Sequence, residues 1–212
     1  MIALIDYGSG NIRSVFKALQ HEGAEVELIG AAEGLKRADA VVLPGVGAFG
    51  DCVRGIEARG LWEPLHAWLE SGRPFLGICV GYQLLFDESE EAQDGTRGFG
   101  FFAGKVRRFT TPGLKVPQIG WNSLDFTPPD HWLWRGLPKK PHVFFVHSYY
   151  PAPENAEETI ATCEYGESFA AAAARGNVAG TQFHPEKSQA VGLRILRNFV
   201  ARVEEEKAAK AR

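Results

Sequence analysis

Three short apolar runs in the first half of the chain each lead into a glycine-rich turn. They are Ile2–Ile5, Val41–Leu43 and Phe75–Ile78. Between the first two, Ile12–Leu19 carries apolar residues at i, i+3, i+4 and i+7, which predicts a helix that Asn11 caps. Strands that alternate with helices at this spacing favour a parallel sheet with helices on both faces.

The second half is strand-like from Lys105 to about Phe183. The expected strands are Val143–Val146, Thr159–Tyr165, Phe169–Ala174 and Val178–Phe183, the last two joined by a hairpin turn at 175–177. Helical spacing returns around Leu196, and the charged tail Glu204–Arg212 is expected to fray. Since no linker divides the chain, we expect one domain over residues 1–212.

Charge and cysteine content exclude several classes of protein. Lys and Arg total 23 against 26 Asp and Glu, a net charge of −3 that does not suit a nucleic-acid or acidic-membrane binder. The chain has neither a basic leader nor an apolar stretch of about 20 residues, so we expect a cytoplasmic protein. Three cysteines suggest free thiols in a reducing compartment, and no Cys/His spacing predicts a metal or cofactor.

Cys79 lies between two glycines in the segment Gly77-Ile78-Cys79-Val80-Gly81, where a strand passes into a helix. This is the pattern of a nucleophile elbow with cysteine in place of serine. The glycines two residues before and after Cys79 have no side chains, so the sharp turn causes no clash at these positions. The sulfur then stands at a helix N-terminus, where the dipole favours negative charge. Cys52 and Cys163 lack these surroundings and are interpreted as structural.

A cysteine nucleophile needs a base, and the base needs a group that orients it. His184 follows a predicted strand, and Glu186 comes two residues later, across Pro185. The carboxylate can bind one imidazole nitrogen and leave the other facing the sulfur. The tripeptide His184-Pro185-Glu186 alone is weak evidence for a catalytic base. It becomes informative because the same chain also contains the cysteine elbow.

Thioester chemistry also needs donors for an oxyanion. Val80, the residue after the nucleophile, supplies one N–H, and Val46 and Gly47 in the loop after Val41–Leu43 are candidates for the second. Residues 45–50 also match G-x-G-x-x-G, but they follow the wrong strand for a dinucleotide site. Glycines around Val46 make a peptide rotation inexpensive, and such a rotation would switch the site off.

The elbow through Gln83, together with 184–186, resembles class I, triad-type glutamine amidotransferases. The resemblance implies a flavodoxin-like α/β fold, with a mixed, mostly parallel open sheet and helices on both faces. It implies that Cys79 attacks the side-chain amide of glutamine, that His184 shuttles the proton and that Glu186 orients His184. The thioester is hydrolysed to glutamate, and the ammonia passes to an acceptor site.

Five blocks narrow the resemblance to the glutaminase subunits of imidazole glycerol phosphate synthase. They are Asp6–Asn11, Leu43–Phe49, Val116–Asn122, Phe144–Tyr150 and Gly180–Gln189. One departure is Gln118, where that family usually carries His. The implied partner, in a heterodimer, is a (β/α)8-barrel cyclase that makes imidazole glycerol phosphate and aminoimidazole carboxamide ribotide in histidine biosynthesis.

The resemblance also implies which residues hold the amino-acid end of glutamine and which meet the partner. The first group is Gln83, Glu91, Ser148 and Tyr149; the second is Asn11, Trp121 and Lys187. A carboxylate such as Glu91 suits an α-ammonium group. From the residues alone, Glu91 could equally belong to a solvated acidic run, and Gln83 could be an ordinary helix residue.

Two other functions compete with this hypothesis. One is the glutaminase of another pathway, such as aminodeoxychorismate, anthranilate or pyridoxal phosphate synthesis; the Asp6–Asn11 and Gly120–Asn122 blocks count against it. The other is a binding or regulatory module without catalysis. A pure binder has no use for Cys79, His184 and Glu186 together.

Overall fold

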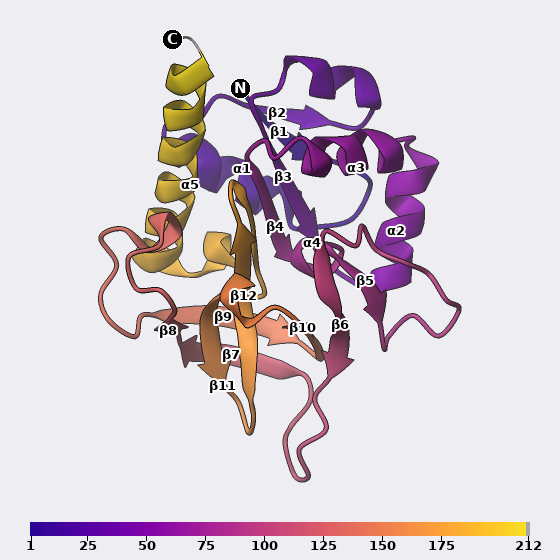
Figure 1. Cartoon of the computed structure of the whole chain (residues 1–212), viewed down its shortest axis with the longest axis vertical. Coiled ribbons are helices and arrows are strands. Elements are labelled where there is room, and N and C mark those ends of the chain that lie inside the picture. The colour runs from indigo at the N-terminus through magenta and orange to yellow at the C-terminus, as the bar shows by residue number, and fades with distance from the viewer. Residues whose placement is uncertain (211–212) are drawn as a thin grey trace.

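The computed structural model describes residues 1–210 and is organised around an eight-stranded sheet (Figure 1). Across that sheet the strands are β2 (Val26–Ile29), β1 (Ile2–Ile5), β3 (Ala40–Gly45), β4 (Phe75–Cys79), β13 (Val178–Thr181), β12 (Ser168–Arg175), β11 (Thr159–Glu164) and β8 (Asp125–Phe126). The first five are parallel and the last three pair antiparallel. The flavodoxin order 2-1-3-4 at one side confirms the expected mixed, mostly parallel sheet.

Two smaller sheets complete the strands of the second half. One contains β10 (Tyr149–Pro153), β6 (Phe102–Arg108) and β5 (Phe86–Ser89), and the other pairs β7 (Gln118–Ser123) with β9 (His142–His147). They lie below the parallel strands in Figure 1, next to β11 and β12. Most of these strands carry aromatic or β-branched residues, which pack well on a pleated surface.

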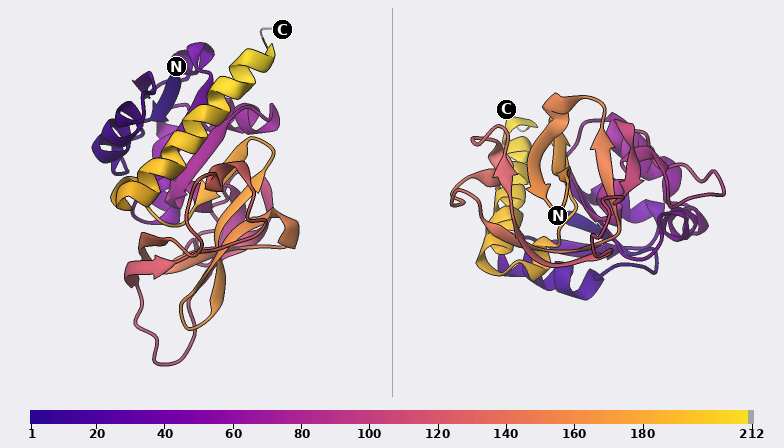
Figure 2. Two further views of the ribbon diagram at one scale, coloured as in Figure 1. Left: turned by 90° about the vertical axis from the view of Figure 1, so that its left-hand side faces the viewer. Right: turned by 90° about the horizontal axis from the view of Figure 1, so that it is seen from below.

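Helices cover both faces of the parallel strands, as the sequence predicts. Figure 2 shows α5 (Gln189–Lys210) lying lengthwise across one face, where it packs against α1 (Ile12–His21). The other helices are α2 (Phe49–Ala58), α3 (Trp62–Glu70), the one-turn α4 (Val80–Gln83) and the 3-10 turns η1 (Ala32–Arg37), η2 (Trp132–Trp134), η3 (Ala156–Glu158) and η4 (Pro185–Lys187). No helix within residues 1–210 is long and apolar enough to cross a membrane.

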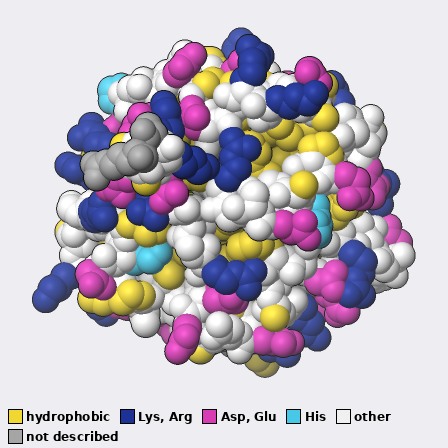
Figure 3. Space-filling view, turned by 45° about the horizontal axis from the view of Figure 1, so that its top comes forward, with side chains coloured by type: hydrophobic (Ala, Val, Ile, Leu, Met, Phe, Trp, Pro, Cys, Tyr) yellow, Lys and Arg dark blue, Asp and Glu magenta, His cyan; other side chains and the backbone are white. Residues whose placement is uncertain are grey.

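The expected fraying of the C-terminal tail is wrong for the residues that the structure describes. Helix α5 continues to Lys210, while Ala211 and Arg212 lie outside the described residues. Arg202 pairs with Glu206 one turn later at 2.8 Å, and Lys207 contacts both Glu204 and Asp39. These i, i+3 and i, i+4 pairs support the last turns. Positive and negative side chains are likewise interspersed over the face seen in Figure 3.

The carboxyl ends of three parallel strands meet at one edge of the sheet. The register sets Gly45 beside Cys79 and Thr181 beside Ile78. The loop after β3, the elbow after β4 and the segment after β13 therefore converge. Crevices outside the carboxyl ends of strands are where open α/β sheets bind ligands.

Candidate active site

Cys79 ends β4 in a strained backbone conformation, with φ 56° and ψ −112°. The strain depends on the two flanking glycines. A Cβ placed on Gly77 would lie 2.5 Å from the Gly81 carbonyl oxygen, and one on Gly81 would lie 1.9 Å from the Leu43 carbonyl oxygen. Side chains are therefore excluded at both positions, which is the geometry of a nucleophile elbow. The following helix is one turn long, so its dipole is weaker than the sequence suggests.

His184 and Glu186 form a buried pair beside this elbow. The Nδ1 atom of His184 lies 2.9 Å from Oε1 of Glu186, and the two side chains are 2% and 0% exposed. The backbone of His184 is held at both ends, because its N–H donates to the Phe144 carbonyl and its carbonyl accepts from the Ser188 hydroxyl. Its other nitrogen, Nε2, is buried without a hydrogen-bond partner.

The charges of the pair favour a protonated imidazole. Burial alone would lower the pKa of His184, but the neighbouring Cys79 sulfur and the Glu186 carboxylate outweigh it and raise this pKa to about 10. Burial likewise opposes ionisation of Glu186, yet the hydrogen bond with His184 brings the pKa of Glu186 below its usual value. His184 can thus hold a proton next to the sulfur at neutral pH.

A cavity of about 430 Å³ opens onto Cys79 and His184. Its wall contains most of the residues that the sequence singles out: Val46, Gly47, Val80, Gln83, Glu91, Ser148, Tyr149 and Lys187. Its volume falls in the usual range for small-ligand sites, about 300–1,000 Å³. Glu186 lies behind His184 and is not part of the wall.

Two of the expected substrate-binding side chains are fixed by hydrogen bonds. Gln83 is 3% exposed and donates to the Tyr149 carbonyl at 3.0 Å and to Gln182 Oε1 at 3.1 Å. Glu91 accepts the Phe49 N–H through Oε2 at 2.8 Å, which holds its carboxylate at the cavity wall and caps α2. Glu91 is therefore more than part of a solvated acidic run.

Comparison with known proteins decides the family. Residues 3–203 match the model of the family described as glutamine amidotransferase class-I. The chain belongs to this family. Within it, the amidotransferase is 50% identical over 206 residues to the imidazole glycerol phosphate synthase subunit HisH of Microcystis aeruginosa, covering 96% of both chains. The HisH subunit of Syntrophotalea carbinolica is also 50% identical, over 207 residues.

Solved structures support the same fold. PurLQS from Thermotoga maritima superposes with a TM-score of 0.74 at 18% identity, covering 97% of this chain and 98% of the other. A crystal structure described as a glutamine amidotransferase gives 0.75 at 19% identity, covering 96% and 100%. These likenesses concern the arrangement of helices and strands.

Two side-chain contacts at the site of the amidotransferase were not predicted from the sequence. Asn11 was expected at the partner interface and as a helix cap, but its side chain does not cap α1. Its Nδ2 donates to Oε1 of Glu186 at 3.1 Å, which steadies that carboxylate. Gln182 is fully buried, and its Nε2 lies 3.8 Å from the Cys79 sulfur. The sequence did contain one signal for Gln182: it lies two residues before His184, and residues two apart in an extended segment point to the same face.

The departure at Gln118 does not touch the triad. Gln118 is 2% exposed and contacts Nε2 of His147 at 2.8 Å, while Nδ1 of His147 lies 2.8 Å from the Tyr149 carbonyl. Burial lowers the pKa of His147 to about 4, so the ring is neutral with one proton. That proton belongs on Nδ1, because a carbonyl only accepts. The Gln118 atom at 2.8 Å from Nε2 is Oε1, and because both atoms would then be acceptors, the hydrogen bonding assigns the reversed amide, with NH₂ toward Nε2.

The exposed apolar side chains of β7 lie beside the cavity. Ile119 is 63% exposed and Trp121 46%, and they occupy one face of the strand because they are two residues apart. Pro117, just before the strand, is in the cavity wall. Lys187 belongs to the same wall and stands 6.0 Å from the Phe144 ring centre, with Trp121 edge-on to that ring.

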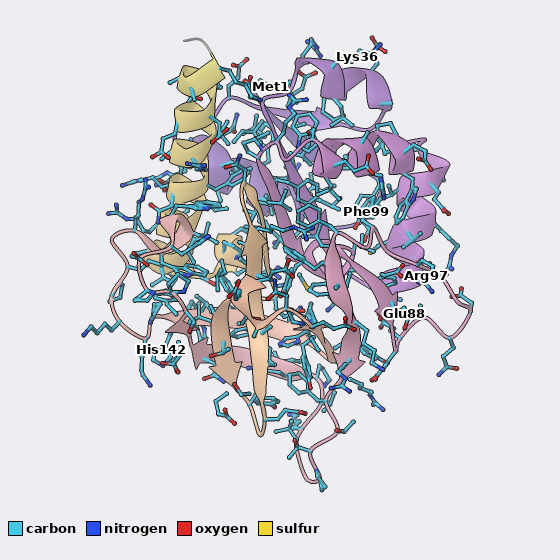
Figure 4. All side chains as sticks on the ribbon, viewed as in Figure 1. Met1, Lys36, Glu88, Arg97, Phe99 and His142 are labelled. Atoms are coloured by element: carbon cyan, nitrogen blue, oxygen red, sulfur yellow. The ribbon has the colours of Figure 1, made fainter. Side chains whose placement is uncertain are left out.

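A larger hollow on the molecule carries no nucleophile. It measures about 720 Å³ and lies between β5, β6 and β10. Two of its charged wall residues, Asp87 and Glu88, pair with Arg97, which is seen near Glu88 in Figure 4. Within residues 1–210, no group of three or more His, Cys, Asp or Glu side chains is arranged to hold a metal ion.

We expect the free energy of unfolding to fall as the pH rises from about 6.5 to about 10. Unfolded His184 has a pKa near 6.5 and folded His184 about 10, so over this interval only the folded chain keeps the proton. The stabilisation that the proton on His184 contributes is complete below pH 6.5 or so, and it is lost as the pH rises through about 10. Urea unfolding across this range measures the slope. His184→Gln should flatten it, and an unchanged slope would contradict the assignment.

Proposed function

We propose that this amidotransferase hydrolyses glutamine to glutamate and ammonia with Cys79, His184 and Glu186, acting as one glutamine amidotransferase domain over residues 1–212. The proposal rests on one observation: the elbow cysteine shares a cavity with His184, which Glu186 holds from behind in a buried pair. A binding module would gain nothing from holding the backbone of Cys79 in strain.

The chemistry follows from the positions of these groups. Nε2 of His184 already holds the proton of the Cys79 thiol when the sulfur attacks the amide carbon. Val80 and the loop of Val46 and Gly47 offer N–H groups to the oxyanion. The imidazolium then protonates the departing amine, and ammonia leaves as the C–N bond breaks. Next, His184 deprotonates a water that attacks the thioester, and the sulfur leaves to release glutamate.

Substrate orientation is assigned to the other wall residues. Glu91 pairs with the α-ammonium of glutamine, while backbone and hydroxyl groups of Ser148 and Tyr149 hold its α-carboxylate. Gln83 lies at the same amino-acid end, where its Oε1 can accept a hydrogen bond because both of its amide N–H groups are already engaged. The fixed positions of Gln83 and Glu91 support this, because a side chain already held in place loses less entropy on binding.

We infer further that the ammonia is used by a second subunit. The relatives at 50% identity are named as subunits of imidazole glycerol phosphate synthase. The partner we propose is the (β/α)8-barrel cyclase of that synthase, in a cytoplasmic heterodimer. The products are imidazole glycerol phosphate and aminoimidazole carboxamide ribotide for histidine biosynthesis. The glutaminases of other pathways are the second candidates. The 50% identity of this chain to HisH subunits counts against them.

Glutamate release, measured with and without the purified cyclase and its nucleotide substrate, tests the whole proposal. We expect slow turnover by the chain alone and strong stimulation by the loaded cyclase. Stimulation by the partner of a different pathway, with none by the cyclase, would assign the chain to that pathway.

The exposed face of β7 is the proposed docking surface, together with Lys187. Trp121→Ala should weaken binding to the cyclase by about 30-fold or more, the typical effect of losing an aromatic hot spot. Leu28→Ala is the matched control, because Leu28 is 47% exposed on the edge strand β2. Calorimetric titration measures both affinities. Equal, small losses in the two variants would place the interface elsewhere.

A further inference from the structure

Two hydroxyls and a thiol hold the carbonyl groups of the oxyanion loop. The Tyr7 hydroxyl donates to the Pro44 carbonyl at 3.0 Å. The Val46 carbonyl accepts from the Ser9 hydroxyl at 2.6 Å and from the Cys52 thiol at 3.6 Å. Tyr7 and Ser9 follow β1 and Cys52 belongs to α2, so the loop is tied to two neighbouring elements.

These contacts flank one peptide group, the Gly45–Val46 unit. The Pro44 carbonyl belongs to the peptide before it, and the Val46 carbonyl belongs to the peptide after it. Because each peptide is planar, a bound carbonyl fixes the orientation of its whole plane. Gly45 pairs with Cys79, so the peptide between the two fixed planes lies next to the nucleophile.

The Tyr7 side chain is rigidly placed. Tyr7 is 5% exposed, and a Cβ on Gly55 would come within 2.9 Å of its ring. A Cβ on Gly45 would lie 3.0 Å from the Tyr7 hydroxyl oxygen. Burial raises the pKa of Tyr7 and of Cys52 above their ordinary values, so both keep the protons that they donate. The Tyr7 hydroxyl thus stays against Gly45.

We infer that Tyr7 and Ser9 are positioning residues for the oxyanion loop. Their hydroxyls hold the peptides on either side of Gly45–Val46 and confine rotation to that single peptide. The Val46 N–H can then turn toward the substrate while the rest of the loop keeps its place, and Gly45 allows that turn because it has no side chain. The inference rests on the proposed glutaminase function.

Ser9→Ala and Tyr7→Phe each remove one hydroxyl and little else. In the complex with the loaded cyclase, we expect the kcat for glutamine to fall about three- to tenfold in each variant, the usual net effect of one neutral hydrogen bond. The KM for glutamine should stay within about twofold of the wild type, because neither residue lines the cavity. Synthesis from ammonium salts should be unchanged, and Ser9→Thr should restore kcat.

Two hydroxyls elsewhere in the chain provide matched controls. Ser71 donates to the Trp68 carbonyl at 2.6 Å, and Tyr165 donates to the Lys115 carbonyl at 2.7 Å. Ser71→Ala and Tyr165→Phe should keep the wild-type kcat. Wild-type kcat in Ser9→Ala and Tyr7→Phe would overturn the inference, and so would an effect on KM alone. Failure of the proposed function is recognised separately, because Cys79→Ser would then still release ammonia from glutamine.

Discussion

Replacing Cys79 with serine should remove glutamine-dependent synthesis and leave synthesis from ammonium salts intact. In the proposed mechanism only the release of ammonia uses the thiol, whereas the acceptor reaction takes place on the proposed cyclase partner. Loss of the nucleophile from a triad typically lowers kcat by about 10⁶-fold, which is below detection in a coupled assay. The measurement compares product formation from glutamine and from ammonium chloride in the same complex.

Cys163→Ala is the control for this experiment. Cys163 is 1% exposed in β11, and burial raises the pKa of its thiol to about 12, so it is an inert core residue. Its replacement should preserve glutamine turnover. If glutamine turnover survived Cys79→Ser but not Cys163→Ala, the assignment of Cys79 as the nucleophile would be wrong.

Loss of His184 has the second-largest expected effect. His184→Ala should lower the glutaminase kcat by about 10²–10⁴-fold, the usual contribution of a positioned acid–base group. Glu186→Gln should cost less. It weakens the stabilisation of the imidazolium, while its remaining carbonyl oxygen still accepts from Nδ1. Steady-state glutamate release gives both values.

The comparison needs a histidine outside the site. His142, labelled in Figure 4, is exposed at the start of β9, and His142→Ala should leave kcat unchanged. A Glu186→Gln variant slower than His184→Ala would reverse the proposed division of labour between base and orienting group.

Apolar runs predicted most of the sheet because burial on both faces leaves a simple pattern. Ile2–Ile5 is entirely buried and matches β1 without a change of bounds, and β3 and β4 extend the predicted runs by one to three residues. Strand β2 was missed because Leu28 is 47% exposed and only Ile29 is buried. A half-exposed strand of four residues has too little periodicity to be recognised.

The candidate site was predictable where chemistry restricts the local sequence. A strained elbow demands glycines, so Cys79 stands out in one short segment. The contact of Asn11 with Glu186 joins residues 175 positions apart, and no local pattern encodes it. The same holds for Ser9 and Val46, which the sheet brings together across 37 residues.

The three cysteines are all buried, but their surroundings differ, and this difference allows alkylation to count active sites. Cys52 and Cys163 are buried and their pKa values are raised, so they are poor targets for alkylating reagents. Cys79 lines the cavity that it shares with His184, and neither of the other two belongs to the wall of that cavity. A limited dose of iodoacetamide should therefore add one label per folded chain, and the labelled fraction measures how much of a preparation is competent. An electrophilic glutamine mimic would distinguish that same thiol by shape as well as by reactivity.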